Sequence, residues 1–285
     1  FSPDGFATID DSDSLIIEPN GTLSKRETDG IDVYLFMYKD DFTKALKEYY
    51  RLTGYPPLIP RYTLGVWYGK DTAMNSEQIL ETVNTFMNKK IPLSTFYLTN
   101  KWHLQLGTPT GFSWDLHNIP NPQLLIEKLH QLNVRFGLYI NPIAGIQPDE
   151  QLYDKAATYL GIENNQVIPC APYDPKWLDV YLKIFLHPLE AIGVDYFIND
   201  FAEVEYFDML SVFNRYHYLD HNRSINRRGL TVARNGLKAS HRYPINYTGN
   251  NLVSWQVLAF LPKFNYSAAN IGLSWITNDI GGFQG

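Results

Sequence analysis

The sequence has one cysteine and no large cluster of basic residues. A single thiol, Cys170, cannot form a disulfide within the chain and is a poor metal site. We interpret it as a small buried apolar side chain. We expect no metal or other cofactor. Lys and Arg number 24 against 30 Asp and Glu, which gives a net charge of −6. No group of cations could neutralise a run of phosphates, so we expect no nucleic-acid partner.

Long apolar runs and a secretory leader are also missing. No run approaches the roughly 18–20 apolar residues that a membrane-spanning helix needs, so we predict a soluble protein without a membrane partner. The first residues, Phe1-Ser2-Pro3-Asp4-Gly5, have neither the basic nor the apolar region of a signal peptide, and we therefore expect a cytoplasmic location. Because no initiator methionine is present, we expect the chain to be part of a longer polypeptide. The sequence does not specify an oligomeric state.

What is present fits a folded domain rich in aromatic residues. Of the 285 residues, 45% are hydrophobic and 19% charged, which excludes intrinsic disorder and suits one large domain or two small ones. Aromatic residues make up 15%, with 20 Tyr, 16 Phe and 6 Trp. Such a surplus is common in carbohydrate-binding clefts and equally common in large cores, so it does not decide the function alone.

The first forty residues have the pattern of short strands joined by turns. Residues 14–17 are a brief apolar run, Asn20-Gly21 favours a tight turn, and residues 31–38 alternate as a strand does. Asp40 is placed to cap a helix that runs to about Leu52. We predict that residues 1–45 are the remnant of a β-rich N-terminal domain together with its lead-in.

From about residue 60, apolar strand patterns alternate with helical ones. Helices are predicted over 76–89, 122–132 and 175–192. The predicted strands are 63–68, 93–98, 134–140, 194–198, 230–233, 245–247 and 273–276. This alternation indicates a parallel sheet with right-handed crossovers, at the pace of a (β/α)8 barrel.

The alternative to a barrel is an open, doubly wound sheet. That fold should have a glycine-rich phosphate turn after its first strand, and Trp67-Tyr68-Gly69-Lys70-Asp71 is not one. We therefore predict an α/β fold in which residues 46–285 form a TIM-type (β/α)8 barrel, incomplete because it contains strands one to seven. Without an eighth strand two edges stay unpaired, so we expect further protein to complete the barrel.

Barrel enzymes carry their reacting groups at the C-terminal ends of the strands. Polar residues follow the predicted strands at Lys70, Thr99 to His103, Asn141, Asn199 to Glu203, Arg234, Asn246 to Asn251 and Asn278-Asp279. A single carboxylate in such a place is as often the cap of the next helix. Two carboxylates, an arginine and several indoles facing one mouth favour a functional site.

These residues resemble glycoside hydrolase family 31, which contains α-glucosidases and α-xylosidases. The segment from Gly193 to Glu203 resembles the strand that carries the family's nucleophile, and Asp279-Ile280-Gly281-Gly282-Phe283 resembles its Asp-Ile-Gly-Gly-Phe element. Shorter similarities occur at Arg234, His241 to Pro244, Gly249, Trp255, Phe112 to Asp115, Pro120-Asn121-Pro122 and His187-Pro188-Leu189-Glu190. The similarity extends from about residue 30 to the last residue.

The resemblance implies a double displacement that retains α stereochemistry. One carboxylate attacks the anomeric carbon while an acid about 5–5.5 Å away protonates the leaving oxygen. Asp200 stands at the nucleophile position and Asn250 at the acid/base position. The residues expected to contact substrate, an oligosaccharide or small α-glycoside, are Trp67, Thr99, Trp102, His103, Arg234, Tyr247, Trp275, Asp279 and Phe283.

Several positions depart from the family pattern. Asn250 replaces the acid/base aspartate, and an amide has no proton to give, so general acid catalysis, worth about 10²–10⁴-fold, should be missing. Thr99 and Lys101 replace two acids after the second strand, while Lys70 replaces an arginine and Asn278 a histidine or proline. Several changed positions favour natural drift over an altered mechanism or a single engineered substitution.

Three hypotheses of different classes follow. The first is a retaining α-glycosidase acting on an α-glucoside-like substrate. The second is a catalytically lapsed relative that binds carbohydrate or serves as a scaffold, which Asn250, Thr99 and Lys101 favour. The third, a barrel enzyme for phosphorylated metabolites, needs a phosphate site in the loops after strands seven and eight, which Gly281-Gly282 could imitate.

Overall fold

The computed structural model describes residues 2–27, 29–105, 107–163, 165–199, 209–224, 227–234 and 238–283. The chain divides into two compact units. The sheet unit comprises residues 58–233, and the terminal unit combines residues 1–57 with residues 234–285. None of the helices in the described ranges is both long enough and apolar enough to span a membrane.

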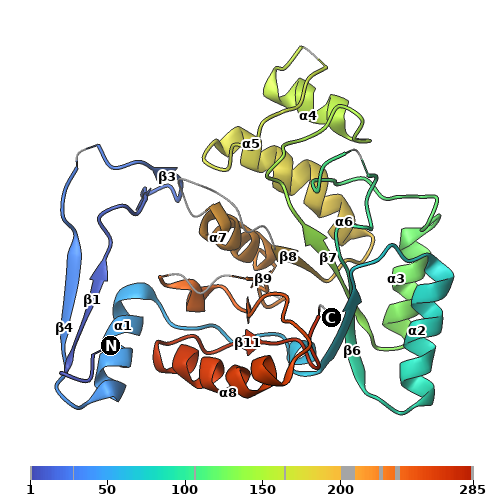
Figure 1. Ribbon diagram of the computed structural model, residues 1–285. Coiled ribbons are helices and arrows are strands. Elements are labelled where there is room, and N and C mark those ends of the chain that lie inside the picture. The colour runs from blue at the N-terminus through green and yellow to red at the C-terminus, as the bar shows by residue number, and fades with distance from the viewer. Residues whose placement is uncertain are drawn as a thin grey trace. The chain divides into compact units, whose positions relative to one another are not determined.

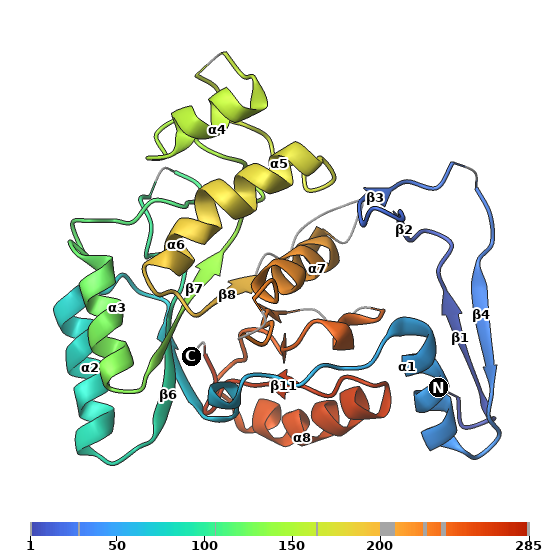
Figure 2. The ribbon, with the colours of Figure 1, turned by 180° about the vertical axis from the view of Figure 1, so that it is seen from behind.

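In the sheet unit, parallel strands alternate with helices. The strands, which pair in chain order, are β5 (Val66–Lys70), β6 (Leu93–Leu98), β7 (Arg135–Ile140), β8 (Tyr196–Asn199) and β9 (Val232–Ala233). The helices between them include α2 (Ser76–Asn88), α3 (Pro122–Gln131), α4 (Tyr153–Leu160) and α7 (Met209–His221). Helices α2 and α3 lie side by side along β6 and β7 (Figures 1 and 2). This is the strand–helix alternation that the sequence predicts.

Local sequence signals set where α2 and α3 begin. Asn75 caps α2, because its side chain accepts the Gln78 N–H while the Gln78 side chain accepts the Asn75 N–H. Asn121 caps α3 by accepting the Leu124 N–H, and Pro122 occupies the first turn, where a missing N–H costs nothing. Both helices start where these caps predict.

The predicted helix over 175–192 is divided into three parts. It consists of α5 (Pro175–Asp179), a π-helical segment (Val180–Leu186) and α6 (His187–Ala191). Pro188 has no N–H to donate, and in a regular α-helix its ring would clash with the carbonyl four residues earlier. A wider helical turn before the proline avoids this conflict, which explains why one apolar pattern yields three segments.

The two faces of the sheet are filled differently. On the face toward α2 and α3, Phe96 and Phe136 are completely buried in an apolar core. Half-buried Cys170 packs against this core, and burial raises the pKa of its thiol to about 12. On the other face lie aromatic rings and hydroxyls, with the Tyr196 ring 5.0 Å from the Trp67 ring and the Tyr196 hydroxyl 2.6 Å from that of Thr95.

The terminal unit joins both ends of the chain. Its antiparallel pairs are β1 (Phe6–Asp10) with β4 (Val33–Met37) and β2 (Ile16–Ile17) with β3 (Leu23–Ser24). Its remaining elements are α1 (Phe42–Thr53), α8 (Trp255–Asn270) and the parallel strands β10 (Asn246–Tyr247) and β11 (Ile276–Thr277). The Tyr50 hydroxyl donates to the Gly272 carbonyl over 2.9 Å and links α1 to the segment before β11. The predicted domain boundary near residue 45 stays a prediction.

Candidate functional site

The predicted site residues are divided between the two units. Trp67, Thr99, Trp102 and His103 belong to the sheet unit, and the predicted residues from Arg234 onward belong to the terminal unit. Asp200, the predicted nucleophile, lies outside the described residues. Each half of the site is therefore built up by itself.

In the terminal unit, three predicted residues meet at the C-terminal ends of β10 and β11. The Tyr247 hydroxyl lies 3.0 Å from Asn250 Oδ1 and 2.8 Å from Asp279 Oδ2. Because a phenol has a single proton, it can donate fully to only one oxygen at a time, and the carboxylate is the stronger acceptor. The acid/base position is thus occupied by an amide that shares one phenol with a carboxylate.

The loops after β10 and β11 are fastened to each other around this cluster. The Asn251 N–H donates to Asp279 Oδ2 over 3.2 Å, and the Phe283 N–H donates to the Asn251 carbonyl over 2.7 Å. Gly282 has a φ of 92°, and a Cβ there would lie 2.8 Å from the Val253 Cα, so only glycine fits. This packing explains the Gly-Gly step and brings Phe283 beside the Asn250 loop.

Arg234 also lies against the Asn250 loop, whereas Trp275 is held elsewhere in the unit. A Cβ on Gly249 would be 3.3 Å from the Arg234 Cδ, so the arginine side chain passes directly over that glycine. The Trp275 indole N–H donates to the Pro57 carbonyl over 2.8 Å. Trp275 precedes β11, so it lies at the start of that strand, and this placement gives no support to its prediction as a substrate contact.

In the sheet unit, the predicted contact residues after β6 are buried rather than open. Thr99 is 5% exposed, and its hydroxyl lies 3.4 Å from the Lys70 carbonyl. Trp102 is 1% exposed, donates its indole N–H to the Tyr139 carbonyl over 2.8 Å, and meets the Trp114 ring edge-on at 4.9 Å. Trp102 therefore packs in the core and fixes the loop after β6 to β7.

His103 is buried beside Trp102, and Trp67 faces the opposite end of the sheet. The His103 Nδ1 lies 2.8 Å from the Leu104 carbonyl, and burial lowers the pKa of the imidazole. The Trp67 indole N–H donates to the Thr63 carbonyl over 3.0 Å. Because Thr63 precedes β5, Trp67 lies at the beginning of its strand. That His103 and Trp67 contact substrate stays a prediction. The position of Trp67 at the beginning of β5 gives that prediction no support.

A buried acid that the sequence did not single out supports the loop after β6. Glu150 is 4% exposed, and it accepts the Phe112 N–H over 3.0 Å and the Ser113 hydroxyl over 2.5 Å. Phe112 and Ser113 belong to a segment that carries the family resemblance. That resemblance was the one sequence signal that could have pointed to Glu150, their hydrogen-bond partner. In the ranges that the structure describes, no three His, Cys, Asp or Glu side chains are grouped to hold a metal ion.

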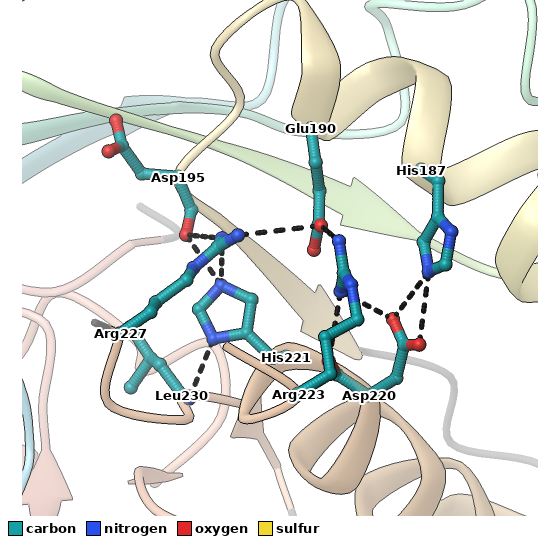
Figure 3. Close-up of polar contacts among 8 residues, drawn as sticks. All are labelled: His187, Glu190, Asp195, Asp220, His221, Arg223, Arg227 and Leu230. Carbon is teal, nitrogen blue, oxygen red and sulfur yellow. Dashed lines mark hydrogen bonds and ion pairs between the residues drawn. The ribbon is translucent and has the colours of Figure 1, made fainter. Parts of the chain in front are cut away.

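A second feature missed from sequence is a charged cluster at the beginning of β8 (Figure 3). Glu190, whose side chain is 6% exposed, pairs with Arg223 and lies 3.4 Å from Arg227. The His221 Nε2 lies 2.9 Å from the Asp195 carbonyl, and its Nδ1 accepts the Leu230 N–H over 2.9 Å. Burial, reinforced by Arg227, lowers the pKa of His221 to about 4.

The cluster extends along the surface through Asp220. Arg223 donates to Asp220 Oδ2 over 2.8 Å, and the His187 Nε2 lies 3.0 Å from the same carboxylate (Figure 3). These contacts join α6, the start of β8, the end of α7 and the segment before β9. In barrels this end of the strands serves stability rather than chemistry.

Comparison with known proteins gives a consistent picture. An α-xylosidase from Saccharolobus solfataricus is 24% identical over 277 residues, which cover 89% of this chain and 37% of that protein. The α-xylosidase XylQ from Lactiplantibacillus pentosus is 25% identical over 285 residues, which cover 88% of this chain and again 37% of the relative. This chain therefore spans little more than a third of these curated relatives.

Solved structures match the same fold at low identity. A family-31 α-xylosidase from a soil metagenome, complexed with xylose, matches 99% of this chain and 46% of its own with a TM-score of 0.75 and 15% identity. The cycloalternan-degrading enzyme from Trueperella pyogenes matches 91% of this chain and 44% of its own, with a TM-score of 0.72 and 15% identity.

A family model settles the membership and the fold class. The model described as the TIM-barrel domain of glycosyl hydrolases family 31 matches residues 56–285, which include every strand from β5 to β11. The barrel predicted from the alternation of strands and helices is confirmed. The chain belongs to glycosyl hydrolase family 31, and residues 56–285 are its TIM-barrel domain.

Proposed function

We propose that this chain is the catalytic-type barrel of a retaining α-glycoside hydrolase that acts on α-glucoside-like substrates and lacks its own general acid. Support comes from the family membership and from relatives named α-xylosidase and α-glucosidase. The ligand is an oligosaccharide or small α-glycoside, and support comes from similar structures that are complexes with xylose and isomaltose. The cytoplasmic location expected from sequence remains part of this proposal.

The arrangement of Tyr247, Asn250 and Asp279 carries the proposal. The three side chains lie within hydrogen-bond distance through one phenol, at two strand ends. An amide at this point can bind a sugar hydroxyl or glycosidic oxygen, but it has no proton to transfer. A substrate whose leaving group is already a good one needs little protonation, so such a substrate is the one this site can cleave.

The reaction then proceeds in two steps. The Asp200 carboxylate attacks the anomeric carbon, the bond to the leaving oxygen breaks, and a glycosyl ester forms on Asp200. Water must next attack that ester and lose a proton to a base. Since Asn250 cannot accept the proton, the ester persists, and a nucleophile such as azide, which needs no base, can replace water.

Mass spectrometry of the full-length protein with an activated α-glycosyl fluoride tests this directly. We expect one added glycosyl group on the peptide that contains Asp200, and its release as glycosyl azide when azide is added. The Asp200→Asn variant is the control, and it should acquire no label. A folded full-length protein that stays unlabelled under these conditions would contradict the proposal.

A second candidate is a carbohydrate-binding or scaffold protein without turnover. Thr99 favours it, because this buried hydroxyl lies 3.4 Å from the Lys70 carbonyl and stands where the family has an acid. Calorimetry separates the two candidates. Binding of an α-glucoside without label on Asp200 is the outcome that the binding protein predicts.

A further inference from the structure

The C-terminal end of β8 is held by three buried, uncharged polar side chains. Asn199, the last residue of β8, is 0% exposed, and its Nδ2 donates to Asn214 Oδ1 and to the Thr231 hydroxyl, over 3.1 Å in each case. Asn214 is 2% exposed and Thr231 0% exposed. We call these three residues the amide cluster.

The amide cluster joins three elements at one point. Asn214 belongs to α7, and Thr231 immediately precedes β9. The backbones of β8 and β9 are also paired, with Asn199 opposite Ala233. In the sequence, Asp200 directly follows Asn199 and Arg234 directly follows Ala233. One amide thus fixes the chain immediately before two of the predicted site residues.

Stability alone does not account for this cluster. Asn199 Oδ1 is buried and has no hydrogen-bond partner among the described residues. Burying such an atom costs free energy, and a well-packed apolar residue would avoid that cost. Phe197, two residues earlier on the same face of β8, is apolar and 4% exposed, and its ring centre lies 5.9 Å from that of His217.

The lack of charge in the cluster fits a reacting carboxylate better than an ion pair would. A nucleophilic carboxylate must be ionised, and a fixed charge beside it would either raise its pKa or weaken its attack. Amide and hydroxyl groups fix the backbone through directed hydrogen bonds without adding a net charge.

We propose that Asn199, Asn214 and Thr231 are positioning residues that set the direction of the chain at the end of β8 and so hold the Asp200 carboxylate for attack. This inference rests on the proposed function, which gives Asp200 its role. Positioning matters because a displacement of about 1 Å at a reacting group can cost on the order of 10²-fold in rate.

The test compares two substitutions at opposite ends of β8. Thr231→Val keeps the side-chain shape and removes one acceptor of the amide cluster. Thr95→Val is the matched control, because Thr95 is also 0% exposed and its hydroxyl bonds the Tyr196 hydroxyl at the beginning of β8. Asn199→Leu removes the whole cluster and should give the larger effect in the same direction.

The readout is binding of two probes to the full-length protein, measured by calorimetry. The iminosugar 1-deoxynojirimycin carries an ammonium group that pairs with a nucleophile carboxylate, whereas glucose is neutral. We expect Thr231→Val to weaken iminosugar binding by about tenfold and glucose binding by less than about threefold. Thr95→Val should leave both affinities unchanged while lowering the melting temperature by a similar amount.

Equal losses of iminosugar affinity in Thr231→Val and Thr95→Val would overturn the inference, as would a wild-type protein that does not bind the iminosugar. Failure of the proposed function looks different, because the wild type would then bind the iminosugar but acquire no glycosyl label. If the label does form, Thr231→Val should lower its rate of formation at saturating fluoride and leave the half-saturating concentration unchanged.

Discussion

The two ends of β8 are held by opposite kinds of interaction. At its beginning, charged side chains surround the strand, with Glu190 between two arginines and His221 on the Asp195 carbonyl (Figure 3). At its end, the amide cluster is neutral and leaves the Asn199 Oδ1 unsatisfied among the described residues. The charged groups pair with one another, whereas the neutral end contains an oxygen without a partner in the part of the chain that the structure describes. The difference indicates that the first end was shaped by stability and the second by the chemistry expected there.

The distance between the two ends of β8 explains how one short strand can have a stabilising cluster at its beginning and a neutral cluster at its end. Residues of a strand are about 3.3 Å apart, so about five residues separate the two ends by roughly 13–16 Å. Charges at that separation, partly exposed to water, are largely screened at physiological salt. The charged cluster can therefore stabilise the beginning of β8 without changing the ionisation of a carboxylate that follows the end of this strand.

The largest expected effect is on rate, at the C-terminal strand ends. Asn250→Asp should raise hydrolysis of glycosides with poor leaving groups by about 10²–10⁴-fold, because it restores a proton donor. The new carboxyl would share the Tyr247 hydroxyl with Asp279, and repulsion between two carboxylates raises the pKa of one, as a general acid requires. Hydrolysis of an α-linked disaccharide by the full-length protein measures the gain.

The neighbouring Asn251→Asp change is the matched control for this prediction. It adds the same charge to a residue whose side chain donates to the Thr248 hydroxyl instead of contacting Tyr247. We expect no gain in rate from it. Equal rates for the two variants would show that the acid position is assigned to the wrong residue, and the melting temperature of both should stay close to that of the wild type.

The next largest effect is a loss of stability in acid, at the beginning of β8. The folded-state pKa of His221 is about 4, below its ordinary value of 6.5. The unfolded chain therefore binds the proton first as the pH falls, so the stabilisation is complete above about pH 6.5 and is lost between about 6.5 and 4. One histidine shifted this far contributes about 3 kcal/mol over that window. Urea unfolding at about pH 7.5 and about pH 4.5 measures the difference.

His221→Asn makes the pH prediction specific. An asparagine oxygen can still accept the Leu230 N–H, so part of the structure is kept while the titrating group is removed. The variant should be less stable than the wild type at neutral pH and should lose less stability on acidification. His217 titrates in both proteins, because burial, reinforced by His221, lowers its pKa to about 3. An unchanged pH dependence would contradict the assignment.

A smaller effect is expected from Glu190→Gln. The substitution removes the charge that Arg223 and Arg227 share, and we expect a loss of about 2 kcal/mol in the free energy of unfolding. Asp179→Asn is the control, because its pair with Lys183 is largely exposed and should contribute less than about 0.5 kcal/mol. Neither variant should alter the labelling of Asp200 at a temperature where both are folded. A change in labelling would break the contrast between the two ends of β8.

The sequence predicted the strands well because buried parallel strands are nearly continuous apolar runs. The run 93–98 coincides with β6, and residues 230–233 and 245–247 each contain a strand of two residues, while the run 273–276 ends where β11 begins. The ends of the strands were less predictable, because a ladder begins only where a partner strand provides hydrogen bonds. This matters for β5, which begins at Val66, since Arg61–Leu64 form a 3-10 turn.

The sequence predicted where the site residues lie along the strands, but not which side chains contact one another. Placing polar residues at strand ends identified Tyr247, Asn250 and Asp279, yet their shared hydrogen bonds depend on side-chain geometry that no spacing encodes. Trp67 was expected at the mouth because it lies near the end of the predicted strand 63–68, whereas β5 begins at Val66 and puts Trp67 near the beginning of the strand; its contact with substrate stays a prediction. The charged cluster could not be predicted either, because its members are spread over residues 187–230 and converge only in three dimensions (Figure 3).

The smallest expected effect comes from Arg135→Gln, which tests whether the beginning of β8 depends on many shared contacts or on one. Asp195 accepts from the Arg135 guanidinium over 3.1 Å, from the Phe136 N–H over 2.8 Å, and lies 2.7 Å from the His130 Nε2. The Arg135 side chain is 47% exposed, so water and salt screen its pair with Asp195. Its guanidinium also lies 5.8 Å from the centre of the Tyr62 ring, which adds a weak attraction.

Two of the three contacts to Asp195 remain in this variant, so we expect a loss of only about 0.5–1 kcal/mol in the free energy of unfolding. Raising the salt concentration to about 0.5 M should reduce the difference from the wild type, because the shorter Debye length screens an exposed pair more strongly. Urea unfolding at low and high salt measures both quantities. A loss above about 2 kcal/mol that salt does not reduce would show that one arginine, and not a set of shared charges, holds this end of β8.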